Sequence, residues 1–288
     1  MELSLNVNYL MKHRPEEPGR TIEDCMRLCA EAGFRVADYT PPVSRDDWEV
    51  QTDRAMEAAS RYGIVIEQSH APYNRYEKAP LEDYSRRMQR AMDAAVRMGN
   101  RQIVIHADDY ALEPDGSYNA DHALSQMYEF WAPFVDSAVS RGVEVAVETV
   151  FEDRSPADRT RFTSRPEELL AMIDRFGEHR VRCCWDTGHA RLAFSREKMG
   201  NVMRTLGRRI SCTHIHDNYY GKDLHLTPFA GDIDWEEQMR TLKEIGYTGN
   251  LTFEFVYGSR PAALLGDFLH TAWHTGCYLR RLFEEHTV

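Results

Sequence analysis

Short apolar stretches rich in β-branched residues alternate along the chain with longer segments that have helical periodicity. Runs of this length, separated by helical patterns, are typical of successive strand–helix units. We expect eight strands, at residues 3–10, 35–40, 64–71, 102–108, 143–150, 181–188, 211–218 and 250–256.

The segments between these strands carry the start and stop signals of helices, such as an early threonine or proline and a terminal glycine. The clearest of them cover residues 21–34, 84–99, 165–177 and 234–249. The last segment, residues 261–286, predicts either one long helix or two short ones.

Eight strand–helix units without a long linker predict a parallel sheet that is covered by helices. At 288 residues, a single closed (β/α)8 TIM barrel, forming one domain over residues 1–288, fits this alternation better than an open doubly wound sheet. No GxGxxG motif follows the first strand, so the most specific signal of a dinucleotide-binding fold is missing.

Composition narrows the classes of partner. The formal net charge of −11 disfavours nonspecific binding to nucleic acid, because an acidic surface repels phosphates. No apolar run reaches the roughly 20 residues that span a bilayer, and the first 20 residues lack the pattern of a secretory signal. We therefore expect a cytoplasmic protein that binds neither membrane nor nucleic acid.

Cysteines and aromatic residues add little to this picture. None of the six cysteines forms a CxxC pair, and we expect them to be reduced and mostly buried. The last helix is rich in aromatic residues, which either cover the barrel or form the interface of a homo-oligomer; they are Phe268, Trp273, Tyr278 and Phe283.

Imidazole and carboxylate side chains follow six consecutive predicted strands, where a (β/α)8 barrel builds its active site. These residues are His70, His106, Asp108, Glu148, Asp186, His189, His214, His216, Asp217, Asp223, His225 and Glu254. Carboxylates gathered at one buried rim repel each other unless a cation neutralises them. Imidazole and carboxylate together are the ligand set of Zn, Mn, Co or Fe, which predicts a divalent metal site. Period-two alternation places His214 and His216 on the same face, so it does not choose between them.

Seven short motifs carry a resemblance to a known family. In order they are SHAPY (69–73), VIHAD (104–108), VAVET (145–149), CWDTGH (184–189), HIHDN (214–218), DLHLTPFAGDIDW (223–235) and FEF (253–255). In this order the chain resembles the xylose isomerase-like TIM barrel superfamily, which groups sugar isomerases and epimerases with the apurinic endonucleases of family 2. The resemblance covers essentially the whole chain.

The resemblance implies a ligand set for one divalent metal ion (Mn, Mg, Zn or Co), made of Glu148, Asp186, His214 and Glu254. His214 is preferred over His216 because the metal histidine of the family usually lies three residues before an acidic residue, here Asp217. Further residues match the multi-metal branch of the superfamily, so the number of ions stays open; they are His70, His106, His189, Asp223 and His225.

By the same resemblance, we expect an isomerase or epimerase that acts on a sugar, a polyol or a sugar phosphate through a metal-stabilised enediolate. Glu148 and Glu254 would transfer the protons, while His189 and His216 would hold substrate hydroxyls. Lys222 and Arg260 are candidates for a phosphate contact.

Three other functions remain open. An inosose-dehydratase-like lyase shares the first proton abstraction. A multi-metal phosphodiesterase resembling apurinic endonucleases would use the additional histidines, and a sugar-binding barrel without catalysis would keep only the fold. The chain also departs from the family at Pro228-Phe229-Ala230-Gly231, where relatives commonly have Pro-Gly-x-Gly, and this departure predicts an altered pocket wall at Phe229.

Overall fold

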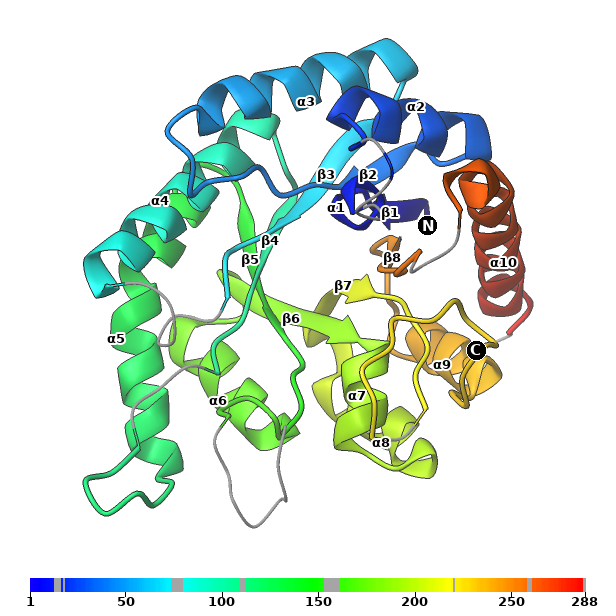
Figure 1. Cartoon of the computed structure of the whole chain (residues 1–288). Helices are drawn as coiled ribbons and strands as arrows, with labels where there is room; N and C mark the ends of the chain where they lie inside the picture. Colours follow the sequence, from blue (N-terminus) through cyan, green and yellow to red (C-terminus); the bar gives the residue numbers. More distant parts are fainter. Residues whose placement is uncertain are drawn as a thin grey trace.

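The sheet of the protein contains eight parallel strands. A computed structural model of the chain describes residues 1–12, 17, 19–73, 80–108, 112–152, 161–219, 221–257 and 261–286. Its strands are β1 (Leu3–Asn6), β2 (Val36–Asp38), β3 (Val65–His70), β4 (Gln102–Ile105), β5 (Glu144–Glu148), β6 (Val181–Asp186), β7 (Ile210–His214) and β8 (Leu251–Phe253). They pair in the order β7-β6-β5-β4-β3-β2-β1-β8, as Figure 1 shows.

The two strands at the ends of this order, β7 and β8, also meet. Ile215, directly after β7, forms a parallel bridge with Phe253. The backbone N–H of Ile215 donates to the carbonyl oxygen of Thr252 at 2.7 Å, and that of Glu254 donates to the carbonyl oxygen of Ile215 at 3.1 Å. These bonds close the sheet into a barrel, so the predicted (β/α)8 fold is confirmed.

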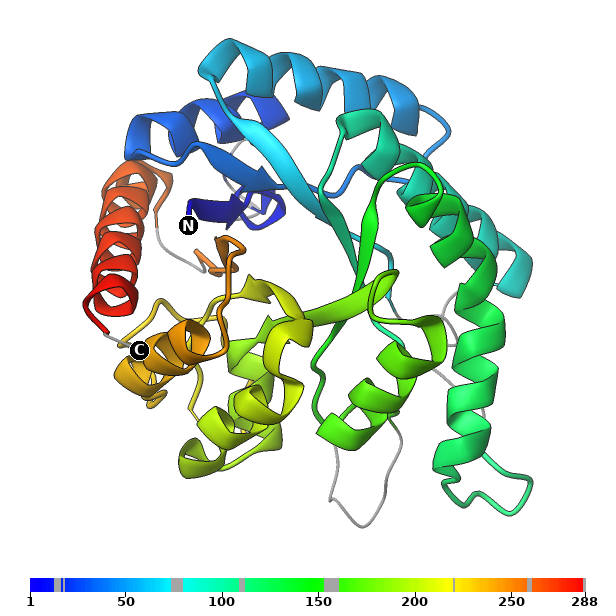
Figure 2. The ribbon, with the colours of Figure 1, turned by 180° about the vertical axis from the view of Figure 1, so that it is seen from behind.

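Helices surround the sheet on its outside, which Figure 2 shows from behind. The α-helices are α1 (Asn8–Met11), α2 (Ile22–Ala32), α3 (Trp48–Tyr62), α4 (Leu81–Met98), α5 (Ala120–Val139), α6 (Pro166–Phe176), α7 (Thr187–Ala193), α8 (Arg196–Leu206), α9 (Trp235–Glu244) and α10 (Leu265–Glu285). Two short 3₁₀ helices, η1 (Gly207–Arg209) and η2 (Ala262–Leu264), precede β7 and α10. None of the helices in the described part of the chain is long and apolar enough to cross a lipid bilayer.

Helix α2 illustrates how local sequence sets the element boundaries. Thr21 and Asp24 form a capping box at its start, which satisfies two backbone N–H groups that would otherwise lack partners. At its end, Gly33 has a φ of 115°, and an added Cβ would lie 2.6 Å from Cε2 of Trp273 in α10. Glycine is therefore required at this position both for the backbone and for the packing of α10 against α2.

Several predicted strands are shorter in the structure than the apolar pattern suggests. The strand expected at 3–10 ends at Asn6, because the Val7 carbonyl accepts the Leu10 N–H and α1 begins at Asn8. The strand expected at 211–218 ends at His214. The last segment forms one long helix, α10, after a single 3₁₀ turn.

Apolar side chains fill both sides of the sheet. The main core lies between the strands and the helices, and it includes the fully buried Trp131, Trp185 and Trp235. Phe268, Trp273 and Phe283 of α10 pack against this core, so these three predicted aromatic residues cover the barrel. All six cysteines are free and five of them are buried, as expected.

Candidate active site and metal centre

The barrel interior is arranged in layers, and the candidate site is the layer at the carboxyl ends of the strands. A small apolar cluster inside the barrel consists of Val104, Ala146, Cys184 and Cys212. Side chains two residues apart on a strand share a face. The next inward position on β5, β6 and β7, and the residue just after β4, are accordingly Glu148, Asp186, His214 and His106.

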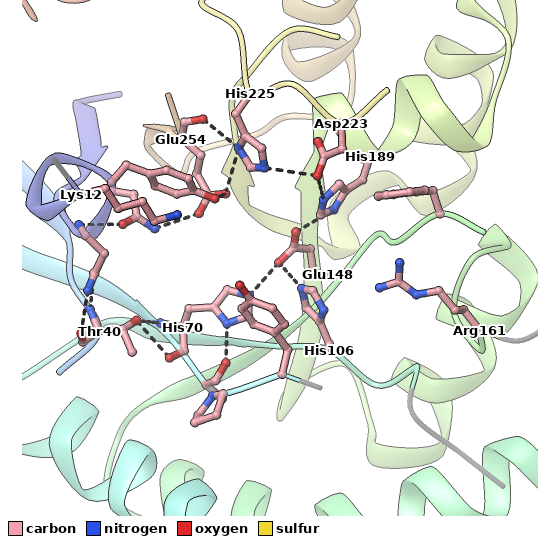
Figure 3. Close-up of a pocket in the computed structure, with 17 residues that line it drawn as sticks. Lys12, Thr40, His70, His106, Glu148, Arg161, His189, Asp223, His225 and Glu254 are labelled. Carbon is pink, nitrogen blue, oxygen red and sulfur yellow. Dashed lines mark hydrogen bonds and ion pairs between the residues drawn. The ribbon is translucent and has the colours of Figure 1, made fainter. Parts of the chain in front are cut away.

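Glu148 lies at the centre of this layer and is surrounded by imidazoles. Its Oε2 is 3.0 Å from Nε2 of His70, 3.1 Å from Nε2 of His106 and 3.3 Å from Nδ1 of His214. Its Oε1 is 2.9 Å from Nδ1 of His189. Figure 3 shows the His70, His106 and His189 rings directed at this carboxylate. One buried carboxylate thus gathers histidines from β3, from the end of β4, from α7 and from β7.

Asp186 ends β6 and also starts α7. Its Oδ1 accepts the backbone N–H of His189 at 2.6 Å, which caps the helix. The same carboxylate contacts Nε2 of His216 at 2.9 Å and Nδ1 of His214 at 3.8 Å. The Asp-Thr-Gly-His sequence therefore brings a fully buried carboxylate and an imidazole together within one turn of helix.

Glu254 follows β8 directly and has a different set of neighbours. The amide nitrogen of Asn6 donates to its Oε1 at 2.9 Å, and the Tyr9 hydroxyl donates to its Oε2 at 3.5 Å. Nδ1 of His225 lies 3.9 Å from Oε2 and 2.9 Å from the backbone oxygen of Glu254. The Glu254 carboxylate is thus held mainly by neutral donors from β1 and α1.

His214 and His216 are both fully buried, but their contacts differ. His214 lies beside four acidic residues. Its Nε2 is 3.6 Å from Oε1 of Glu254 and 3.7 Å from Oδ2 of Asp38, in addition to the contacts of its Nδ1 with Glu148 and Asp186. His216 contacts Asp186 and stacks on His225, with ring centroids 3.9 Å apart. Both histidines belong to groups of potential ligand atoms, His214 with Asp38 and Glu254 and His216 with Asp186 and Glu254.

The loop after β7 is held by a residue for which the sequence suggested no structural role. The Asp217 carboxylate is fully buried. It accepts the backbone N–H groups of Phe229 at 2.9 Å and Ile233 at 3.2 Å, and the indole N–H of Trp235 at 2.9 Å. An added Cβ on Gly231 would lie 2.2 Å from Oδ1 of Asp217, so this glycine permits the close approach.

The prediction that Phe229 forms part of the pocket wall is wrong. Phe229 has a φ of 71°, a left-handed conformation that favours glycine. With its N–H bound to Asp217, its ring lies against Trp235 and Tyr278 at centroid distances of 6.2 and 5.6 Å, and 53% of the residue is exposed. Phe229 therefore faces α10 and is not among the described residues that line the cavity.

A cavity of about 420 Å³ opens above this layer. The predicted residues that line it are His70, His106, Glu148, His189, Asp223, His225 and Glu254. Asp186, His214 and His216 lie beneath it, fully buried. Arg260 lies outside the described residues, and Lys222 is exposed and does not line the cavity within the described ranges.

The lining residues that were not predicted include Asn6, Tyr9, Lys12 and Arg161. Asn6 is the last residue of β1, so the strand-end rule could have found it, but an amide gives a weaker signal than a charged group. Arg161 lies in the segment between β5 and α6, and its Nε is 2.6 Å from Oδ2 of Asp108. Positions on such a segment are not fixed by strand periodicity.

Burial and neighbouring charges shift the proton affinities of the site in opposite directions. Burial raises the pKa of Glu148, but the rings of His214 and His106 outweigh it and hold that pKa well below its usual range. Burial lowers the pKa of His189, but Asp186, Asp223 and Glu148 raise it well above its usual value. Burial, followed by the charge of Glu254, raises the pKa of Tyr9, so its hydroxyl keeps its proton.

The donor set fits a divalent cation. Two ligands bonded to one ion at about 2.1 Å lie roughly 3–3.5 Å apart, and Nδ1 of His214 is 3.3 and 3.8 Å from oxygens of Glu148 and Asp186. This buried nitrogen has no hydrogen-bond partner among the described residues, as expected for an atom that ligates an ion.

The four predicted ligands do not form one compact group of their own. Potential ligand atoms within 4.8 Å of one another instead form overlapping groups, among them Glu148–Asp186–His189, Asp38–His214–Glu254 and Asp186–His216–Glu254. Two further groups lie at the sides, His70–His106–Glu148 and His189–His216–Asp223–His225.

The fold and the site together define a (β/α)8 barrel with a carboxylate–imidazole centre at its mouth. Residues 26–269 match the family described as xylose isomerase-like TIM barrel, and the chain belongs to this family. It is 26% identical over 238 residues to the uncharacterized protein y4fM of Sinorhizobium fredii. The alignment covers 81% of this chain and 70% of that protein. It is 26% identical over 204 residues to the uncharacterized protein MJ1311 of Methanocaldococcus jannaschii, covering 69% and 67%.

Solved structures with the same fold include a D-tagatose 3-epimerase-like protein, with a TM-score of 0.75, 19% identity and 99% of both chains covered. A D-psicose 3-epimerase determined in the presence of D-fructose has a TM-score of 0.75, 15% identity and coverage of 98% and 99%. The 3-keto-D-glucoside 4-epimerase of E. coli has a TM-score of 0.70, 16% identity and coverage of 97% and 100%. At these identities the likeness establishes the shared fold.

Proposed function

We propose that the protein is a divalent-metal-dependent isomerase or epimerase of a sugar, a sugar phosphate or a related polyol. The observation that carries this proposal is the placement of two carboxylates. Glu148 and Glu254 line the same cavity, from β5 and from the end of β8, on the two sides of the His214 ring, as the lining residues and the distances to its two nitrogens indicate. Figure 3 shows both carboxylates at the cavity.

Two carboxylates at one cavity suit the removal of a proton from carbon and its return on the other face. One carboxylate takes the hydrogen next to the substrate carbonyl, and the other delivers a hydrogen to the opposite face of the enediolate. A divalent ion held by Glu148, Asp186, His214 and Glu254 would supply the Lewis acidity that makes this C–H bond acidic. His189, which lines the cavity, would hold a substrate hydroxyl.

The neighbours of each carboxylate support these roles. The N–H groups of His70, His106 and His189 stabilise the charged form of Glu148. The Asn6 amide and the Tyr9 hydroxyl orient the carboxylate of Glu254. The structures of similar fold that are sugar epimerases support the substrate class, a monosaccharide or a glycoside with a carbonyl group.

The test is proton exchange at carbon. The purified protein, loaded with Mn²⁺, is incubated in deuterated buffer with ketoses, ketose phosphates, 3-keto-glycosides and inososes, and the products are followed by NMR. We expect deuterium to enter next to the carbonyl of one class, together with formation of the epimer or isomer. Binding of a sugar without exchange in any class would contradict catalysis and favour a binding barrel.

The same experiment separates the lyase alternative. A dehydratase removes the same proton but then expels a hydroxyl group, so it would yield an unsaturated or deoxy product in place of an epimer. If water is lost at the same rate as deuterium enters the substrate, the protein is a lyase and not an epimerase.

A second candidate function has a specific observation in its favour. The two lateral ligand groups, His70–His106–Glu148 and His189–His216–Asp223–His225, could hold additional ions and serve hydrolysis of a phosphodiester. The net charge of −11 opposes binding to nucleic acid. Cleavage of an abasic duplex by the metal-loaded protein, abolished by Asp223→Asn, would establish this candidate over the isomerase.

A further inference from the structure

A second cavity, of about 550 Å³, lies next to the one above the carboxylate–imidazole layer, the catalytic cavity. The residues that line the second cavity come from α1, the start of α2, the segment after β2, and α3. Figure 1 shows α2 and α3 side by side. Asn8 and Thr40 line both cavities, and Figure 3 shows Thr40 at the edge of the catalytic cavity. The two cavities therefore share a wall.

The shared wall contains a pair of hydrogen bonds between the start of α1 and the segment after β2. Nδ2 of Asn8 donates to the carbonyl oxygen of Thr40 at 2.8 Å, and the Thr40 N–H donates to Oδ1 of Asn8 at 2.8 Å. The Asn8 N–H donates at 3.1 Å to Oδ1 of Asn6, whose amide holds Glu254. A molecule that lies across this wall would therefore have one end near the proposed proton-transfer group and the other end in the second cavity.

A buried phenol at the second cavity lacks a partner. Tyr39 directly follows β2, and only 2% of the residue is exposed, yet it is among the residues that line the second cavity. Its hydroxyl has no hydrogen-bond partner within the described ranges of the chain. Most buried side-chain polar atoms are hydrogen-bonded, and a phenol can both donate and accept. A hydroxyl group of a ligand in this cavity would be a suitable partner.

The charged residues around the second cavity balance each other. Among the described residues that line it, the arginines Arg54 and Arg61 are matched by the glutamates Glu23 and Glu57. Arg61 forms an ion pair with Glu23, whereas Arg54 and Glu57 are exposed and have no ion-pair partner in the described part of the chain. A lining without net formal charge does not select a phosphate or another ion. Its donors and acceptors suit a neutral ligand with several hydroxyl groups.

Much of the remaining lining is apolar. These side chains belong to Met11, Ile22, Pro42 and Ala58. A sugar ring presents the same two kinds of surface, with C–H groups on its faces and hydroxyl groups around its edge. Sites for small molecules combine apolar side chains with a few polar groups in this way, in cavities of roughly 300–1,000 Å³. The second cavity therefore suits a neutral sugar ring.

We propose that the second cavity binds the second ring of the substrate, so that the substrate is a neutral glycoside with two sugar rings and not a free monosaccharide. The ring that reacts lies in the catalytic cavity, and the glycosidic bond crosses the wall formed by Asn8 and Thr40. This inference rests on the proposed function and names its substrate class. Its first readout is the binding of sugars that cannot react, so its failure is distinguishable from a failure of that function.

The first experiment compares one-ring and two-ring ligands by isothermal titration calorimetry with the Mn²⁺-loaded protein. Methyl glycosides of glucose, galactose and mannose provide one ring, and methyl glycosides of maltose, cellobiose, lactose and mannobiose provide two. None has a free carbonyl group, so none can react by proton transfer. We expect at least one two-ring ligand to bind about 10-fold or more tightly than its one-ring counterpart, because only it reaches the second cavity. If no two-ring ligand binds more tightly than its counterpart, the proposal is overturned.

The second experiment locates the second ring. Tyr39→Phe removes only the hydroxyl, and we expect the two-ring ligand to bind about 3- to 10-fold more weakly, the usual contribution of one hydrogen bond. Binding of one-ring ligands should stay the same. Tyr128→Phe is the matched control, because Tyr128 lies in α5, packs on Phe176 and is not among the described residues that line either cavity. We expect its affinity for the two-ring ligand to equal that of the wild type.

Ala58→Leu gives a test that does not depend on a single hydrogen bond, because the larger side chain occupies part of the second cavity. We expect the preference for two rings to be largely lost and the affinity for one-ring ligands to stay the same. The proposal is overturned if both Tyr39→Phe and Ala58→Leu keep the full preference, or if they weaken one-ring and two-ring binding equally. A preference for two rings without proton exchange in any keto-glycoside would contradict the proposed function alone.

Discussion

Glu148 and Glu254 face the same cavity but are held in different ways. Glu148 contacts four imidazoles, from His70, His106, His189 and His214. Glu254 accepts hydrogen bonds from an amide and a phenol, those of Asn6 and Tyr9. The groups around Glu148 are imidazoles, which can carry a charge, whereas those around Glu254 are an amide and a phenol that keep their hydrogens. Two carboxylates of one site can therefore respond differently to pH and to metal.

The largest expected effect comes from neutralising each carboxylate in turn. Glu148→Gln and Glu254→Gln remove a proton-transfer group each, and we expect turnover to fall by about 10³-fold in both. If the two groups serve opposite faces of the substrate, as proposed, each variant should still exchange the C–H hydrogen of one epimer and not of the other. Deuterium exchange measured from both epimers checks this.

Glu144→Gln is the matched control for this pair. Glu144 starts β5, the strand that Glu148 ends, and pairs with Arg182 at 3.6 Å. It should keep wild-type turnover. Full activity in both Glu148→Gln and Glu254→Gln would end the assignment of proton transfer to these residues.

A smaller effect is expected from the hydrogen bond between Asn6 and Glu254. Asn6→Leu keeps the size of the side chain but removes a donor to a charged group, a bond that contributes about 1.5–3 kcal/mol. We expect a 10- to 100-fold loss of the exchange that depends on Glu254, with the exchange that depends on Glu148 nearly unchanged. An equal loss of both exchanges would show that the two carboxylates are not independently held.

The histidines near Glu148 should make the free energy of unfolding depend on pH. Burial lowers the pKa of His189, His225 and His70, but carboxylates including Asp186, Asp223 and Glu148 outweigh it and raise these pKa values above the ordinary 6.5. The folded protein then binds protons that the unfolded chain releases above about pH 6.5. The stabilisation is complete below that pH and is lost as pH rises through the raised values.

For the metal-free protein, the free energy of unfolding should therefore fall as pH rises from 6.5 to 8, by up to about 1.4 kcal/mol per pH unit for each such histidine. With excess Mn²⁺ the trend should reverse, because ligation requires unprotonated histidines. Urea unfolding with and without Mn²⁺ at several pH values measures both slopes. Slopes of the same sign would contradict the proposal that these histidines bind protons in the metal-free protein and ligate Mn²⁺ when it is present.

The smallest effect is expected in the loop after β7. Phe229→Gly relieves a left-handed backbone that costs a bulky residue roughly 1–2 kcal/mol, but it also removes the ring contacts with Trp235 and Tyr278. We expect the free energy of unfolding to change by about 1 kcal/mol or less and the KM to stay the same. A clear change in KM would show that Phe229 does form part of the pocket wall.

The sequence predicted the barrel and most of the cavity because both follow from periodic features. Alternation of strands and helices gave the fold, and the strand-end rule located Glu148, Asp186 and Glu254. It did not predict that β1 stops at Asn6, because the turn into α1 depends on a backbone hydrogen bond of Val7. The amide of Asn6 was overlooked for a related reason, since its role depends on a contact with Glu254, 248 positions further along the chain.

The distinction between His214 and His216 shows a second limit. Both side chains lie on the same face by periodicity, and only their distances to Glu148 and Glu254 separate them. The position of Phe229 likewise depends on the carboxylate of Asp217. Features of this kind depend on tertiary contacts, which a single sequence does not encode in any local pattern.

We propose that acidic and imidazole groups from separate strands meet around one divalent ion. Crystals grown with Mn²⁺ and measured near the manganese absorption edge test it most directly. We predict a strong anomalous difference peak within bonding distance of Glu148, Asp186 and His214, with Glu254 completing the ligands. A peak bound only by His189, Asp223 and His225, or no peak at the barrel mouth at saturating Mn²⁺, would contradict the account.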